Sequence, residues 1–167
     1  MVEVVLRAVR VDVGSSTPLL LLEEVNGDRV LPIFIGAPEA TAIAYALQNV
    51  ETPRPMSHDL LGAVIESLGA QLFAVEITDL VDNTFYALLR LVRDDVEISV
   101  SARPSDAVAL ALRVGAPMLV RDDLMSDETR LVLLDEDDDA EPAEDEDELL
   151  AELRDFLDTV KPEDFDQ

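Results

Sequence analysis

Two runs of three apolar, strand-like segments constrain the fold of this chain more than any other feature of its sequence. Within each run only a few turn residues separate the segments, and sequence of helical character follows each run. The segments lie at residues 2–13, 18–25, 29–35, 71–81, 83–93 and 96–102. Strands joined by short turns pair antiparallel, whereas parallel neighbours need long crossovers. The order therefore predicts an α+β domain with a mainly antiparallel sheet, rather than a doubly wound parallel sheet.

The turn between the second and third segments gives the strongest local prediction. It contains Asn26-Gly27-Asp28, and Asn-Gly readily supplies the positive φ angles of a tight hairpin turn. Asp82-Asn83 and Asp94-Asp95 separate the segments of the second run, which is predicted to be an antiparallel meander.

About three helices are predicted to pack on the inward faces of these strands. They cover residues 37–49, 57–70 and 105–114, and a short last strand is predicted at residues 118–121. Pro38 suits the first turn of the first helix, Ser57 is the predicted N-cap of the second, and Gly115 is the predicted C-cap of the third. The second helix has an apolar face formed by Leu60, Leu61, Val64, Ile65 and Leu68.

Acidic residues outnumber basic residues by 37 to 12, which gives the chain a net charge of -25. A chain this acidic repels phosphate backbones, so a protein that binds nucleic acid by bulk charge alone is excluded. The charge is unevenly distributed. Residues 1–134 hold 20 acidic and 10 basic side chains, whereas residues 135–167 hold 17 acidic and 2 basic ones.

This asymmetry divides the chain into a domain at residues 1–134 and an appendage. Residues 135–148 form an acidic run too polar to bury a core, and are predicted to be a disordered linker. Residues 149–160 have helical apolar spacing and predict a short amphipathic helix, followed by a tail at residues 161–167. The linker either keeps the protein soluble or occupies a basic site as a nucleic-acid mimic. The helix is expected to dock on the domain, on another subunit or on a protein partner.

The residue types that are missing exclude several kinds of site. The chain contains no cysteine and a single histidine, His58, which excludes disulfides, thiolate chemistry, cysteine zinc sites and any site with two imidazoles. The N-terminus lacks the features of a signal peptide, and no apolar stretch reaches the roughly 18 to 20 residues that span a bilayer. The sequence therefore predicts a cytoplasmic protein with no membrane association.

Polar residues gather around the three predicted helix starts. They are Glu39 at the first helix, Arg54, His58 and Asp59 at the second, and Arg103, Ser105 and Asp106 at the third. A helix N-terminus presents unpaired N–H groups and the positive end of the helix dipole, so each is a candidate anion site, with phosphate as the obvious anion. The same residues also fit a purely structural role as caps and first-turn carboxylates, and the sequence alone does not choose between the two roles.

The chemistry of these side chains suggests individual roles. His58 is the only imidazole available for acid/base chemistry, and Arg54 and Arg103 can hold a phosphate or pair with carboxylates. The carboxylates are oxygen donors that suit Mg²⁺ or Mn²⁺. No spacing motif links them, so the metal is left open.

Two blocks of sequence resemble a known family. LPIFIGAPEATAIAYALQNVETPRPMSHDLL (31–61) and SVSARPSDAVALALRVGAPMLV (99–120) resemble the bifunctional nuclease domain, which is credited with DNase and RNase activity. The resemblance spans about residues 1–133 and implies a compact α+β fold, a homo-oligomer and nuclease chemistry. The family blocks fall on Ile35, Gly36, Glu39, Ala40, Arg54, Pro55, His58, Asp59, Arg103, Pro104, Ser105 and Asp106. The C-terminus departs from relatives that append a short interaction motif.

Two functions remain open at this point. The first is a nuclease that hydrolyses phosphodiester bonds of DNA or RNA. His58, Asp59, Glu39 and Asp106 would be its catalytic residues, and Arg54, Arg103 and Ser105 would bind the substrate. The alternative is a non-enzymatic regulatory or binding module, in which the same residues recognise a small anionic ligand or a partner protein.

Overall fold

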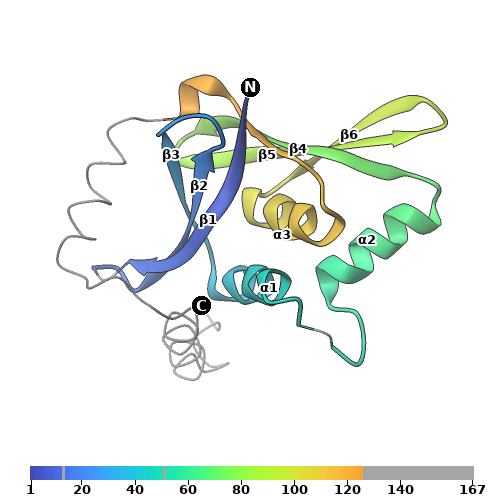
Figure 1. The fold of residues 1–167 in the computed structure, drawn as a ribbon, viewed down its shortest axis with the longest axis horizontal. Coiled ribbons are helices and arrows are strands. Elements are labelled where there is room, and N and C mark those ends of the chain that lie inside the picture. Colours follow the sequence, from blue (N-terminus) through green and yellow to red (C-terminus); the bar gives the residue numbers. More distant parts are fainter. Residues whose placement is uncertain (13, 51, 126–167) are drawn as a thin grey trace.

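The fold is built on one mixed sheet, which we describe from a computed structural model covering residues 1–12, 14–50 and 52–125. The strand order is β3-β2-β1-β7-β4-β5-β6 (Figure 1). The strands are β1 (Val2–Asp12), β2 (Thr17–Glu24), β3 (Val30–Phe34), β4 (Gln71–Val81), β5 (Thr84–Arg93), β6 (Val96–Ala102) and β7 (Met118–Val120). All neighbours pair antiparallel except β4 and β7, which are parallel. The α+β class with a mainly antiparallel sheet is confirmed.

The short strand β7 joins the two meanders into one sheet. It pairs with β1 through Val2 and Val120 on one side, and with β4 through Val75 and Met118 on the other. Because Val120 and Val75 are buried, this seam lies in the core. The sequence predicts the existence of β7 but not its central position.

Three helices cover one face of the sheet (Figure 1). They are α1 (Ala37–Leu47), α2 (Ser57–Ser67) and α3 (Pro104–Val114), and a short 3-10 turn follows at Asp122–Leu124. Helix α3 lies at the centre, between α1, α2 and strands β4 and β5, and its residues from Ala107 to Leu110 are fully buried. Gly115 has φ 70°, in the left-handed region, and caps α3 as predicted.

Helix α2 departs from the prediction that its apolar face belongs to the core. None of its residues is buried, and Leu60, Leu61 and Val64 are between 37% and 53% exposed. Ile65 alone packs, partly buried, against the core cluster. The apolar face is present as predicted, but most of it faces outward.

The turns correct a second expectation. The β2–β3 hairpin forms, but neither Asn26 nor Gly27 has a positive φ. The hairpin closes instead through a wider loop, in which the Glu24 N–H donates to the Arg29 carbonyl at 3.0 Å and the Arg29 guanidinium binds the Glu24 carboxylate. Positive φ angles occur at Asp82-Asn83 and Asp94-Asp95, the two-residue turns of the second meander.

The remaining predictions concern the membrane and the C-terminus. Among the described residues, no helix is long and apolar enough to cross a bilayer. The predicted linker at 135–148, helix at 149–160 and tail at 161–167 lie outside the described residues.

Candidate functional site

The first turns of the three helices lie close together. Gly36, Met56 and Arg103 are the N-caps of α1, α2 and α3, and all three have extended backbone angles. The predicted caps Ser57 and Ser105 are therefore wrong, because Ser57 already belongs to the first turn of α2 and Ser105 to that of α3. Ser105 is also buried, with 6% of its surface exposed. Its role in substrate binding stays a prediction.

Each helix carries a carboxylate at its third residue, and these carboxylates connect the helices. The Oε1 of Glu39, on α1, forms an ion pair with the Nη1 of Arg103 at 2.7 Å. Asp106 of α3 binds Arg103 at 2.8 Å and the Nε2 of His58, on α2, at 3.0 Å. We call Glu39, His58, Arg103 and Asp106 the ion-pair cluster. It brings together four of the predicted site residues from all three helices.

The hydrogen bonds of Asp106 determine its charge. Burial raises the pKa of Asp106, but the hydrogen bonds from Arg103 and His58 lower the pKa by more than burial raises it. The pKa of Asp106 therefore lies below the ordinary 3.8. Asp106 is therefore ionised at neutral pH and accepts from both neighbours. The hydrogen bonds that Arg103 donates to Asp106 also raise the pKa of Arg103, which stays charged.

The low pKa of Asp106 predicts an acid-dependent loss of stability. A carboxylate with a depressed folded-state pKa stabilises the fold above its unfolded-state pKa, and this contribution disappears as the pH falls through the folded-state pKa. We expect Asp106→Asn to lower the Tm most at pH 6, and the difference from wild type to shrink as the pH falls below about 3.8. Asp94→Asn, at a side chain that is 91% exposed, is the matched control. A Tm difference for Asp106→Asn that stays constant down to pH 2 would contradict this origin.

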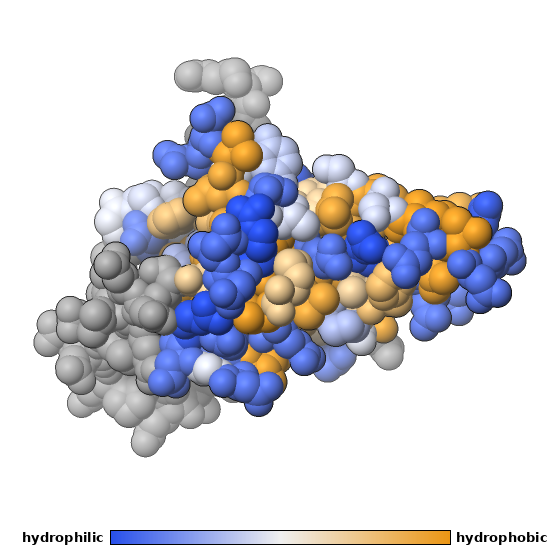
Figure 2. Space-filling view, turned by 90° about the horizontal axis from the view of Figure 1, so that it is seen from above, coloured by the Kyte–Doolittle hydropathy of each residue, from blue (hydrophilic) through white to orange (hydrophobic). Residues whose placement is uncertain are grey.

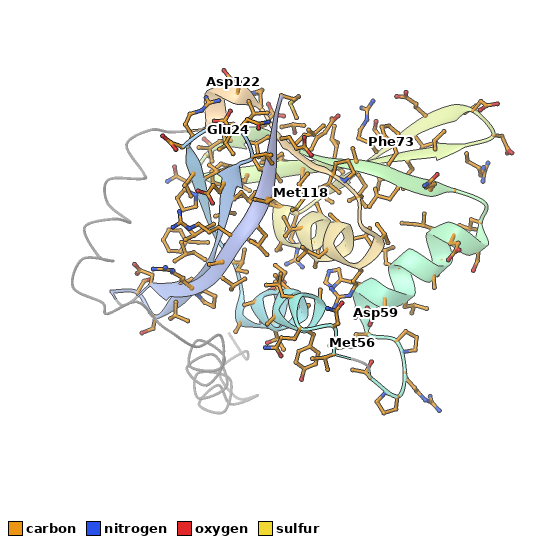
Figure 3. All side chains as sticks on the ribbon, in the orientation of Figure 1. Glu24, Met56, Asp59, Phe73, Met118 and Asp122 are labelled. Carbon is orange, nitrogen blue, oxygen red and sulfur yellow. The ribbon has the colours of Figure 1, made fainter. Side chains whose placement is uncertain are left out.

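Asp59 lies at the same junction but has a different partner. Figure 3 shows it at the start of α2, beside α1 and α3. One carboxylate oxygen accepts from the Met56 N–H at 2.9 Å, and the other accepts from the Nε of Arg113 at 2.5 Å. Burial raises the pKa of Asp59, but these two hydrogen bonds outweigh the burial and the pKa is lowered.

Arg113 is the residue of this site that the sequence analysis missed. Its side chain is 10% exposed, and its other nitrogens donate to the carbonyls of Ala109 and Ala42 at 2.8 and 2.9 Å. It therefore links the last turn of α3 to α1 and α2. A signal was present in the sequence, because Arg113 follows Asp106 by seven residues and so lies on the same face of an otherwise apolar helix.

Arg54 is not part of this arrangement. It is exposed in the loop before α2, and its side chain makes no hydrogen bond or ion pair with any residue that the structure describes. The cluster thus contains one of the two arginines predicted to bind substrate. A role for Arg54 stays a prediction.

A cleft of about 880 Å³ opens between the helices and the start of β4. His58, Asp59 and Arg113 line it, together with Tyr45 and Asn49. Glu39, Arg103 and Asp106 are not lining residues, so His58 is the member of the ion-pair cluster that reaches the cleft. The volume is typical of small-molecule sites.

The charges of the site are nearly balanced. Glu39, Asp59 and Asp106 oppose Arg103 and Arg113, which leaves one net negative charge when His58 is neutral. Among residues 1–12, 14–50 and 52–125, no three His, Asp or Glu side chains come together in a way that suits a metal ion.

Comparisons with known proteins identify the family. The family model of the bifunctional nuclease domain matches residues 20–132. An uncharacterized protein of Mycobacterium tuberculosis (strain CDC 1551 / Oshkosh) is 47% identical over 163 residues, which cover 98% of this chain and 97% of that protein. Bifunctional nuclease 1 of Oryza sativa subsp. indica is 30% identical over 61% of this chain and 32% of its own length. Bifunctional nuclease 2 of Arabidopsis thaliana is 29% identical over 63% of this chain and 32% of its own length. Because the family model matches more than half of its length, the chain belongs to the bifunctional nuclease domain family.

Proposed function

We propose that this protein hydrolyses phosphodiester bonds of DNA or RNA at the cleft between α1, α2 and α3. The observation that carries the proposal is the hydrogen bond between His58 and Asp106. His58 is also a lining residue of the cleft. Membership of the bifunctional nuclease domain family supports it. An imidazole oriented by a carboxylate is a common general base, because the carboxylate stabilises the imidazolium that forms.

The hydrogen bond to Asp106 assigns different tasks to the two ring nitrogens of His58. An ionised carboxylate only accepts, so the Nε2 of His58 carries the shared proton. In the neutral ring the Nδ1 then holds a lone pair, which accepts a proton from water as the water oxygen bonds to phosphorus. The bond from phosphorus to the leaving oxygen breaks, and the imidazolium returns the proton to that oxygen.

Arg103 is placed to stabilise the charge that develops on the phosphate. Three of its five N–H groups donate to Asp106 and Glu39, which leaves two for a ligand. Its side chain is 65% exposed, and it shares the Oδ1 of Asp106 with His58. A phosphate bound beside His58 and Arg103 would therefore meet a charged donor next to the general base.

The balanced charge of the site shapes how a substrate is held. With one net negative charge, the site offers a polyanion no attractive field, so directional hydrogen bonds from Arg103 must supply the binding. The three carboxylates of the site, Glu39, Asp59 and Asp106, are engaged with arginines and His58, and the steps above use none of them as a metal ligand.

Replacing Arg103 tests the proposal. We expect Arg103→Ala to lower kcat on a labelled oligonucleotide by about 10²-fold, the usual effect of losing one donor to a developing anion. Arg121→Ala is the matched control, because Arg121 is also a surface arginine held by two carboxylates, Asp79 and Asp123, but it does not belong to the ion-pair cluster. Rates are measured with EDTA, with Mg²⁺ and with Mn²⁺. If both variants cleave at the wild-type rate, the activity does not arise at this site.

The second candidate function is a binding module for a small anion or a partner's acidic group. It is favoured by the pairing of Arg103 and Arg113 with carboxylates, which resembles a structural ion-pair network as much as a reactive site. Thermal-shift measurements with mononucleotides and inorganic phosphate separate the two functions. Stabilisation that is lost in Arg103→Ala, without turnover of any oligonucleotide, would favour the binding module.

A further inference from the structure

The charged residues that line the cleft do not favour a phosphate inside it. Besides His58, they are Asp59, Glu66 and Arg113. Arg113 is already bound to Asp59, and Glu66 forms no ion pair with any residue that the structure describes. The lining therefore has one net negative charge when His58 is neutral, and its arginine is engaged. An uncharged group fits this cleft better than an anion does, because Glu66 does not repel it.

His58 connects the cleft to the place where a phosphate can bind. Its Nε2 lies 3.0 Å from the Oδ1 of Asp106, and the same oxygen accepts a hydrogen bond from the Nη2 of Arg103 at 3.2 Å. Arg103 itself is not a lining residue of the cleft. A phosphate held by Arg103 would therefore lie next to the cleft and not inside it. The cleft is left to receive the uncharged part of a nucleotide.

The cleft contains an exposed aromatic ring that suits a nucleobase. Tyr45, near the C-terminal end of α1, is 36% exposed and is the only aromatic side chain among the described residues that line the cleft. Val50 and Val114, which also line it, are 43% and 46% exposed. Every nucleobase has a π-face on which an aromatic side chain can stack. One aromatic ring accompanied by apolar side chains is typical of a site for a flat, uncharged ring.

Polar side chains of the same cleft can bind the edge of a base. Asn49, Glu66 and Gln71 line it, and none of these three side chains forms a hydrogen bond with a residue that the structure describes. An amide both donates and accepts, and a carboxylate accepts, so together they match the mixed donors and acceptors on base edges. The cleft therefore offers both stacking and hydrogen bonding, the two interactions that recognise an unpaired base.

We propose that the cleft binds an unpaired nucleobase, which stacks on Tyr45 while a phosphate of the same strand lies beside His58 and Arg103. This inference rests on the proposed hydrolysis and names its substrate class as single-stranded nucleic acid. A base inside a duplex is stacked and paired, so it must leave the duplex before it can enter a pocket. A base in a single strand is already available to stack on a protein ring.

The position of the cleft determines the side from which a strand approaches. The cleft lies between the helices and the start of β4, on the side of the sheet that faces down in Figure 1. Figure 2 shows the molecule from above, where hydrophobic and hydrophilic residues are mixed over the surface. A strand that reaches His58 must come from the helical side, where its bases meet Tyr45 on α1.

A fluorescent nucleoside tests the base site without any phosphate. The fluorescence of 2-aminopurine riboside is quenched when its base stacks, and the chain contains no tryptophan that would interfere. We expect titration with the full chain to quench this probe to saturation. Tyr45→Ala should raise the Kd by about 5- to 150-fold, the effect of losing one base–aromatic contact, and Tyr45→Phe, which keeps the ring, should restore most of the binding. Tyr86→Ala is the matched control, because Tyr86 is the other tyrosine of the chain, is 44% exposed and does not line the cleft.

Binding of labelled strands tests the substrate class. Fluorescence anisotropy at one fixed salt concentration gives the Kd of an oligonucleotide and needs no turnover. We expect the wild type to bind a single strand more tightly than the same sequence in a duplex. Tyr45→Ala should reduce this difference. Arg103→Ala should weaken the binding of both strand forms while the nucleoside still binds.

The outcomes separate this inference from the proposed hydrolysis. A probe that is not quenched, or quenching that Tyr45→Ala leaves intact, would overturn the base site even where cleavage depends on His58 and Arg103. Equal Kd values for single strand and duplex in the wild type would overturn the assigned substrate class. Quenching that depends on Tyr45, without cleavage of any oligonucleotide, would support the base site and overturn the proposed hydrolysis.

Discussion

His58→Ala is expected to lower kcat for phosphodiester hydrolysis by about 10² to 10⁴-fold, the range for the loss of a general acid/base. The reason is that His58 is the only imidazole of the chain and the only member of the ion-pair cluster that lines the cleft. The measurement is the single-turnover cleavage rate of a labelled single-stranded oligonucleotide, with KM determined in parallel. A loss confined to KM would assign His58 to substrate binding instead.

Asp106→Asn separates catalysis from packing at the same hydrogen bond. An asparagine keeps the size of the side chain but cannot stabilise an imidazolium as a carboxylate does. We therefore expect Asp106→Asn to lower kcat, by less than His58→Ala, and to change the pH dependence of the rate. His58→Gln controls for the lost volume. Equal and small effects of all three variants would leave the His58–Asp106 pair with a structural role only.

Local sequence patterns predicted the elements of this fold, while the partners of those elements depended on long-range packing. The turns at Asp82-Asn83 and Asp94-Asp95 lie where the sequence placed them, because the residues that tolerate positive φ are local features. Asn26-Gly27 carried the strongest local signal of all. At this turn the Arg29 side chain binds Glu24 and also Asp122, which comes from a distant segment. The loop is wider and needs no positive φ.

The apolar face of α2 illustrates a second limit. Apolar residues at helical spacing indicate that one side of the helix is sheltered from water. They do not indicate whether the rest of the domain or a partner covers that side. Leu60, Leu61 and Val64 satisfy the periodicity and still lie largely outside the core. An expectation about burial therefore needed the tertiary positions of α3 and β4, which the sequence of α2 does not contain.

The candidate site shows the same division. Residues at helix starts are recognisable from capping and dipole rules, and this is why Glu39, His58, Arg103 and Asp106 were all singled out. Their mutual distances follow from the packing of three helices on one sheet face. Arg113 was missed because it sits at a helix end that no start signal marks. Arg54 was included because its loop neighbours carry the same polar pattern, although the loop leaves its side chain exposed.

Arg113→Ala is expected to lower the free energy of unfolding by about 3 kcal/mol, because it leaves Asp59 without its counter-charge in a partly buried position. The change also removes the hydrogen bonds that Arg113 donates to the carbonyls of Ala109 and Ala42. The bond to Ala42 connects α3 to α1. The expected loss of stability lies at the lower end of the range for broken buried ion pairs, because the Asp59 side chain is 37% exposed and water compensates part of the loss. Urea unfolding measures the free energy, and the Tm should fall by roughly 10 °C.

A double-mutant cycle distinguishes this ion pair from a simple packing role. If the pairing of Arg113 with Asp59 dominates, Asp59→Asn should lower the free energy of unfolding by less in the Arg113→Ala background than in wild type. The reason is that the partner charge is already absent in that background. Arg113→Lys keeps the charge but cannot donate to Asp59, Ala42 and Ala109 together, so it should recover only part of the stability. Additive costs, or full recovery by lysine, would show that Arg113 acts through its aliphatic stem or its charge alone. Since Arg113 holds together the three helices that carry Glu39, His58 and Asp106, the fraction folded must be matched before the activity of any Arg113 variant is compared with wild type.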